Sequence, residues 1–278
     1  MSQDHSKAWR IRNTVQGACT NEGIDQNLSL EEVPKPSPKE AQILVRIHAA
    51  SLNYRDLLKA GQTQGAFDIK LGLGGKNIDG VLQQYAVFDE DALAPLPSHL
   101  TFEEAAALSG PYVSAWNALF GGPQQLIKGD TVVIQGTGGI AVAAGAEHAI
   151  NYKNNPTWSR KILTLTNGRG ADQVLDVVGA STIAESLRAL RQDGLVSAIG
   201  FMSAPEKHDL IPEFIFGAKT IRGLMYDSLG MLQDLSAFVE KHKINPIIAK
   251  AFEWNDAKLA YKAMLAQGFV GKIVVKVE

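Results

Sequence analysis

The sequence predicts an α/β fold in which a doubly wound parallel sheet is joined to a second, mostly β unit. Between residues 101 and 226, near-continuous apolar strands alternate with amphipathic helices, which is typical of a parallel sheet covered on both faces. Before residue 101, short strands with alternating apolar positions are separated by prolines and turns, which is typical of a β unit. At 278 residues the chain has the length of about two domains and can bury a large core.

The first hundred residues are expected to form strands around one short helix. The helix is predicted over 54–61, where YRDLLKAG ends on a glycine. The strands are predicted over 8–12, 27–34, 41–50 and 80–88. Thr101 and Glu104 stand in capping-box spacing and should begin the helix that follows them.

The central region should supply the parallel sheet. Its strands are predicted over 131–135, 174–178, 195–199 and 220–225. A helix is predicted over 181–193, with its apolar residues on one face and Gly194 at its C-terminal end. A last helix over 255–268 and a last strand over 272–277 should rejoin the first unit.

The composition excludes several classes of protein. Lys and Arg number 27 against 29 Asp and Glu, so no net positive field attracts nucleic acid. No window approaches the roughly 18 apolar residues of a membrane span, and no signal-peptide pattern opens the sequence. Cys19 is the single cysteine, which excludes an intramolecular disulfide and a multi-cysteine metal site. We therefore expect a cytoplasmic protein whose partner is a small molecule, not a nucleic acid or a membrane.

A glycine-rich turn follows the first central strand. TVVIQ runs directly into Gly136, Thr137, Gly138, Gly139 and Ile140. Glycines there let backbone N–H groups approach a dinucleotide pyrophosphate at a helix N-terminus. Glycines also mark ordinary strand-to-helix turns, but the place of this turn in an alternating α/β half favours cofactor binding.

The segment after this turn is too short for a complete βαβ unit. Such a unit takes roughly 30 residues and ends in a side chain that reads the cofactor ribose. Here residues 141–149 alone separate Ile140 from the apolar INY at 150–152. The ribose-reading strand is absent, so the sequence leaves NAD and NADP open.

Seven motifs run in order along nearly the whole chain: HAASLNYRDLL at 48–58, DGVLQQYAV at 79–87, LSGPYVSAWNAL at 108–119, GDTVVIQGTGG at 129–139, GRGADQVLDVVG at 168–179, LVSAIGF at 195–201 and GKIVVKV at 271–277. Together they resemble the medium-chain dehydrogenase/reductase superfamily, with its zinc-type alcohol dehydrogenases and quinone oxidoreductases. The resemblance implies a GroES-like catalytic domain over 1–110 completed by 250–278, and a Rossmann domain over 111–249. It also implies hydride transfer with NAD or NADP.

Two stretches are shorter than this resemblance implies, at the junctions Lys70–Leu71 and Ile140–Ala141. The chain is then either an internally shortened variant or ordered segments of a longer chain joined end to end. We expect the second, in which case Cα–Cα distances near these junctions exceed the about 3.8 Å of a trans peptide.

The zinc ligands of the alcohol dehydrogenases are not matched. Asn53 stands where those enzymes place their first cysteine ligand, and Arg55 stands where they place a proton-relay hydroxyl. A zinc site needs three or four ligands at defined spacing, and the six histidines are scattered. We expect no zinc.

The resemblance implies that Asn53 and Tyr54 are catalytic and that Asn53 also contacts the cofactor. The amide can donate to a carbonyl oxygen, and the phenol can donate a hydrogen bond or a proton. The alternative is that Asn53 caps the helix beginning at Tyr54. Asp56 is interpreted as a support for the local backbone, and Arg55 as a solvated charge.

Further cofactor contacts are implied outside the glycine turn. They are Ser114, Val178, Gly179, Gly200, Phe201 and Lys272. The alternative is that these residues belong to the core and turns, and that Lys272 is a surface lysine.

These residues predict a zinc-independent oxidoreductase that uses NAD or NADP. It would transfer hydride to or from a quinone, an enone or an alcohol/carbonyl substrate. The alternative is a truncated or cofactor-poor relative that acts as a binding or structural protein. The resemblance also implies a homodimer, paired through the strand over 220–226.

Overall fold

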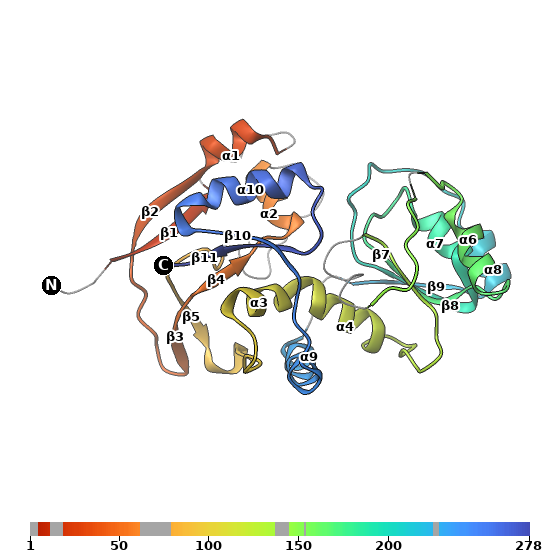
Figure 1. Ribbon diagram of the computed structural model, residues 1–278, viewed down its shortest axis with the longest axis horizontal. Coiled ribbons are helices and arrows are strands. Elements are labelled where there is room, and N and C mark those ends of the chain that lie inside the picture. The colour runs from red at the N-terminus through yellow and green to blue at the C-terminus, as the bar shows by residue number, and fades with distance from the viewer. Residues whose placement is uncertain (1–4, 12–18, 62–78, 137–144, 153, 225–227) are drawn as a thin grey trace. The chain divides into compact units, whose positions relative to one another are not determined.

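The computed structural model (Figure 1) describes residues 5–11, 19–61, 79–136, 145–152, 154–224 and 228–278. The chain divides into two compact units. The terminal unit consists of Met1–Gly110 and Ser236–Glu278, and the central unit consists of Pro111–Leu235. None of the helices in the described ranges combines the length and the apolar character that a bilayer span requires.

A parallel sheet forms the middle of the central unit. Its described strands lie in the order β6 (Val132–Ile134), β7 (Ala171–Asp176), β8 (Leu190–Ala198) and β9 (Thr220–Gly223). Each neighbouring pair is parallel. Every residue of β7 is buried, as expected for a strand inside a sheet that is covered on both faces. The predicted α/β fold class, with its parallel sheet, is confirmed.

Helices alternate with these strands along the chain. They are α4 (Val113–Phe120), α6 (Trp158–Leu165), α7 (Ile183–Ala189) and α8 (Ile211–Gly217). Figure 1 shows α6, α7 and α8 gathered beside β8 and β9. One apolar cluster includes side chains of α6, α7, β7 and β8, among them Trp158, Ile162, Leu187, Val174 and Val196.

Helix α7 is shorter than the predicted 181–193. It ends at Ala189, because the backbone of Leu190 becomes extended and pairs with Ala171 as the start of β8. Gly194 therefore lies within β8 and is not a helix cap. Leu190 belongs to the apolar spacing that predicted another turn of helix. In the structure it is buried as a strand residue instead, with 3% of its surface exposed.

The described strands of the terminal unit form three small sheets. Their strands pair as β1 (His5–Ile11) with β2 (Leu28–Pro34), β3 (Gln42–Arg46) with β5 (Tyr85–Asp89), and β10 (Ile248–Phe252) with β11 (Lys272–Lys276), which also pairs with β4 (Ala49–Ser51). The β10–β11 pair is parallel and the other pairs are antiparallel. The pairing of β11 with β4 brings the end of the sequence against the segment that precedes Asn53.

The described helices of the terminal unit include α1 (Asn21–Asn27), α2 (Tyr54–Gly61), α3 (Phe102–Ala107) and α10 (Ala257–Ala266). The boundary between the two units falls within α9 (Leu229–His242). The predicted capping box of α3 is confirmed. Oγ1 of Thr101 accepts from the N–H of Glu104 at 3.2 Å, and the Glu104 carboxylate accepts from the N–H of Thr101 at 2.9 Å.

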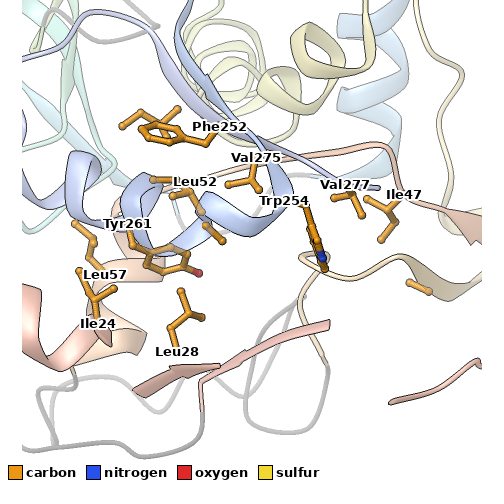
Figure 2. Close-up of a cluster of buried hydrophobic side chains, with 14 residues drawn as sticks. Ile24, Leu28, Ile47, Leu52, Leu57, Phe252, Trp254, Tyr261, Val275 and Val277 are labelled. Atoms are coloured by element: carbon orange, nitrogen blue, oxygen red, sulfur yellow. The ribbon is translucent and has the colours of Figure 1, made fainter. Parts of the chain in front are cut away.

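A hydrophobic cluster holds the terminal unit together (Figure 2). Trp254 is 1% exposed, and Ile24 and Leu28 are buried completely or almost completely. Tyr261 of α10 and Leu57 of α2 pack in the same cluster. The cluster therefore fixes α2, and with it the residues at the start of that helix.

Several predictions fall on parts of the chain that are not described. The junctions Lys70–Leu71 and Ile140–Ala141 lie outside the described residues. So do the predicted cofactor contacts Thr137, Gly138, Gly139 and Ile140, and residues 225 and 226 of the predicted dimer strand.

Candidate active site

Asn53 precedes α2 and is tied to the first turn of that helix. Its backbone N–H donates to Oδ2 of Asp56 at 2.7 Å, and its carbonyl oxygen accepts from the N–H of Asp56 at 2.9 Å. Burial raises the pKa of the Asp56 carboxyl, while the hydrogen bond from Asn53 and the charges of Lys272 and Arg55 act to lower it. Asp56 thus supports the local backbone.

Lys272 reaches Asn53 from the first residue of β11. Its Nζ donates to Oδ1 of Asn53 at 2.7 Å and to the carbonyl oxygen of Leu52 at 2.5 Å. Lys272 is 6% exposed, so the alternative of a surface lysine is wrong. Burial lowers the pKa of Lys272 to about 8, against the raising effect of the Asp56 charge. The fold therefore joins two predicted site residues that lie 219 positions apart.

Gly110 lies against the Asn53 amide. A Cβ atom at Gly110 would lie 3.3 Å from Oδ1 and 3.6 Å from Nδ2 of Asn53. Gly110 also has a φ of 152° in the kinked segment Leu108–Tyr112, a conformation that side chains rarely adopt. Glycine is therefore needed here both for the turn and for the space that the amide occupies.

The two residues that open α2 lie in different surroundings. Tyr54 packs against the hydrophobic cluster of the terminal unit. Nη2 of Arg55 is buried and has no hydrogen-bond partner among the described residues, so Arg55 is not the fully solvated charge that was expected. A role for Asn53 as a helix cap does not account for its side chain, whose Oδ1 accepts from Lys272.

In the central unit, Gln135 links the carboxyl ends of two neighbouring strands. It follows β6 and directly precedes Gly136. Its Nε2 donates to Oδ2 of Asp176 at 2.9 Å, and its Oε1 accepts from the N–H groups of Val177 and Val178 at 3.1 and 3.2 Å. Both ends of the amide are thus used to join β6 to the turn after β7.

Asp176 is the centre of this network and is fully buried. Its carboxylate also accepts from the N–H of Gly179 at 2.8 Å, from Oγ1 of Thr182 at 3.0 Å and from Oγ of Ser186 at 2.6 Å. This network is not predicted from the sequence. The available signal was an acidic residue at the end of a buried strand, two residues before a predicted cofactor contact.

Predicted cofactor contacts meet where β7 and β8 end. A Cβ atom at Gly179 would lie 3.0 Å from the carbonyl oxygen of Gly200 and from Cα of Phe201, and one at Gly200 would overlap the carbonyl oxygen of Val177. Gly179 also has a positive φ of 96°, as does Gly136 with 84°. Glycines therefore bring the backbones at these strand ends close together.

This edge of the sheet fits a dinucleotide. In open parallel sheets, ligands bind beyond the carboxyl ends of the strands, where side-chain-free backbone can approach phosphates. Val178, Gly179, Gly200 and Phe201 all lie at this edge, and Phe201 is 56% exposed. Ser114 lies in α4 of the same unit.

The described residues offer no comparable fit for a metal. No three His, Cys, Asp or Glu side chains come together in the parts of the chain that the structure describes. At Asn53, which the resemblance aligns with the first cysteine ligand of the zinc alcohol dehydrogenases, the amide oxygen already accepts from the Lys272 ammonium.

Known proteins resemble the chain over nearly its whole length. A zinc-type alcohol dehydrogenase-like protein of Schizosaccharomyces pombe is 31% identical over 92% of this chain and 96% of its own. The quinone oxidoreductase of Rattus norvegicus is 20% identical over 88% of this chain and 92% of its own. A family model described as zinc-binding dehydrogenase matches residues 144–275.

Solved structures share the fold. An NAD-dependent alcohol dehydrogenase superposes with a TM-score of 0.80 at 21% identity, over 97% of this chain and 100% of its own. The crotonyl-CoA carboxylase/reductase AntE in complex with NADP gives a TM-score of 0.85 at 19% identity, over 99% of this chain and 95% of its own. With the 31% identity to the Schizosaccharomyces pombe protein, the chain belongs to the medium-chain dehydrogenase/reductase superfamily of oxidoreductases.

Proposed function

We propose that the protein is a zinc-independent oxidoreductase that uses NADPH or NADH to reduce a carbonyl-containing acceptor, such as a quinone or an enone. The observation that carries the proposal is the Asn53 amide, whose oxygen is bound by a buried ammonium. An amide held in this way offers its N–H groups to the oxygen of an acceptor.

The cofactor part of the proposal is supported by the central unit. The nicotinamide supplies the hydride when the cofactor is bound. The glycine-lined ends of β7 and β8 hold the dinucleotide, and the Gln135–Asp176 network keeps these ends in place. Among the structural relatives, one is described as NAD-dependent and another is bound to NADP, so both cofactors stay in the proposal.

Asn53 and Tyr54 act on the substrate. Asn53 donates to the acceptor oxygen, where negative charge develops during hydride transfer. Tyr54 follows it at the start of α2 and is the candidate for hydrogen bonding or proton delivery.

Zinc independence is supported by charge at Asn53. A divalent cation at this residue would lie close to the Lys272 ammonium, 2.7 Å from the same oxygen, and would be repelled by it. The zinc-binding dehydrogenase model matches 144–275 and does not include Asn53, so its description does not supply a ligand at this position.

A second candidate is a relative that binds small molecules without using a cofactor. Its support is the length of the chain. The alignment with the Schizosaccharomyces pombe protein spans 336 positions, whereas this chain has 278 residues, so dozens of positions in that relative have no counterpart here. The shortened stretch after Gly136 would remove part of the adenosine pocket.

Fluorescence titration with NADPH and NADH separates the two candidates. The oxidoreductase predicts saturable binding of at least one cofactor in the micromolar range, followed by oxidation on addition of 2-cyclohexen-1-one or a quinone. Absence of binding for both cofactors supports the second candidate.

We also propose that the protein forms a homodimer paired through β9. Light scattering tests this proposal, and a monomer in solution would contradict it.

A further inference from the structure

Lys272 is a buried cation that the proposed hydride transfer does not itself require. An ammonium has three donor hydrogens and no acceptor. Two of these donors are directed at the segment before α2, namely at the Leu52 carbonyl oxygen and at Oδ1 of Asn53. Both contacts come from a residue that is 6% exposed, so water cannot readily replace either one.

We propose that Lys272 is a positioning residue that fixes which end of the Asn53 amide faces the substrate. The site then presents a donor and selects ligands whose reacting oxygen is an acceptor, such as the carbonyl of a quinone or an enone. This inference rests on the proposed function, because it assumes that Asn53 contacts the substrate.

The alternative amide orientation is disfavoured by its neighbours. A flipped amide would place Nδ2 against the ammonium, so that donor meets donor and a hydrogen bond to a charged group is lost. The backbone of Asn53 cannot compensate easily, since its N–H and C=O are both bound to Asp56. Gly110 leaves room for the amide but offers no side chain that could hold it.

The charges around the ammonium make this positioning dependent on pH. Asp56 on α2 faces Lys272, and Arg55 acts on the same carboxylate. Tyr261 on α10 faces Asp56 as a neutral phenol, because burial, Asp56 and Cys19 raise its pKa. With its pKa lowered to about 8 by burial, Lys272 is charged below that pH and loses its charge above it. The neutral amine keeps two N–H donors but loses the charge that strengthens the bond to Oδ1 of Asn53, and its lone pair can accept from Nδ2. The amide should therefore be held in one orientation below pH 8 and be held less firmly above it.

The first test observes the amide directly and does not depend on activity. In ¹⁵N-labelled wild type, the Nδ2 protons of Asn53, assigned by their loss in Asn53→Ala, should shift with a midpoint near pH 8. The shift should vanish in Lys272→Met and persist in Lys276→Met, which removes an exposed lysine from the same strand. A signal that does not titrate in wild type, or that titrates equally in Lys272→Met, overturns the proposal.

The second test separates positioning from cofactor binding. With 2-cyclohexen-1-one and NADPH or NADH, Lys272→Met should raise KM for the enone by about 10- to 100-fold, the effect of losing a hydrogen bond to a charged group. The cofactor Kd should stay unchanged. In the Asn53→Ala background, Lys272→Met should add little, because Lys272 acts through Asn53. A weaker cofactor Kd with an unchanged enone KM would overturn the proposal and assign Lys272 to the cofactor.

The Lys272→Arg variant distinguishes loss of the hydrogen bond to Asn53 from a folding defect. Arginine keeps the donors and the charge, so this variant should restore part of the enone affinity and lose the pH dependence near 8. If wild type binds neither cofactor, the proposed function fails, while the titration of the Asn53 amide still decides whether Lys272 positions it.

Discussion

Replacement of Asp176 by asparagine tests whether the buried carboxylate network holds the cofactor edge of the central unit. The two oxygens of Asp176 share the hydroxyl of Thr182, at 3.0 Å from each, and otherwise accept from different groups. Oδ1 accepts from the N–H groups of Val178 and Gly179 at 3.1 and 2.8 Å, and neither donor can turn away. Oδ2 accepts from Nε2 of Gln135 at 2.9 Å and from Oγ of Ser186 at 2.6 Å.

These contacts decide how the asparagine amide would lie and what it would cost. Its oxygen should replace Oδ1, so its NH2 group would face Gln135. The Ser186 hydroxyl can rotate and accept, but Gln135 cannot flip, because its Oε1 accepts from two backbone N–H groups. The N–H of Gln135 Nε2 that faced Asp176 is then buried without an acceptor, and the negative charge of the Asp176 carboxylate is lost. We expect the free energy of unfolding to fall by about 2–4 kcal/mol.

Urea unfolding at neutral pH, followed by circular dichroism, measures this loss. Asp130→Asn is the matched control, because Asp130 accepts from one N–H, that of Ile127, at an exposed site where an amide oxygen can serve equally well. The control should stay within about 0.5 kcal/mol of wild type. An Asp176→Asn variant as stable as this control would refute the role given to the network.

Three further predictions concern single side chains. Gly200→Ala should weaken NADPH and NADH binding and lower the free energy of unfolding by about 1–3 kcal/mol, because the added Cβ would overlap the Val177 carbonyl oxygen. At Gly223 an added Cβ meets no described atom, so Gly223→Ala should leave the free energy of unfolding unchanged. Burial raises the pKa of Asp172, but hydrogen bonds from two arginines lower it to about 2. The ionised carboxylate should therefore add about 1–2 kcal/mol to the free energy of unfolding above pH 4, and this stabilisation should be lost as the pH falls through 2. Acid unfolding of wild type and of Asp172→Asn checks this, because the variant should lack the pH dependence. Trp254→Ala should cost about 3–5 kcal/mol in urea unfolding, since the residue is 1% exposed.

The parallel strands of the central unit could be predicted because their signal is local. Runs such as TVVIQ and LVSAIG are apolar at most of their positions, and β6 and β8 form on them. The end of α7 could not be predicted in the same way. Leu190 continues the apolar spacing of the helix, but it pairs with Ala171, a partner that the spacing does not reveal.

Candidate site residues could be proposed one by one from the sequence, but their arrangement could not. Asn53 and Lys272 were each found from short motifs, yet their contact depends on the pairing of β11 with β4, two strands from opposite ends of the sequence. That pairing also buries Lys272, which by itself looks like a surface lysine. Asp176 and Gln135 were missed, because each one is an ordinary polar residue until the strand ends meet.

Transfer of deuterium from cofactor to product tests whether the protein catalyses hydride transfer without zinc. NADPH and NADH, each deuterated at either face of the nicotinamide C4, are incubated with the EDTA-treated protein and 2-cyclohexen-1-one, and the product is analysed by mass spectrometry. We expect one deuterium in the product from one face of at least one cofactor. A product without deuterium from any of these cofactors, or turnover that appears only after zinc is added back, would contradict it.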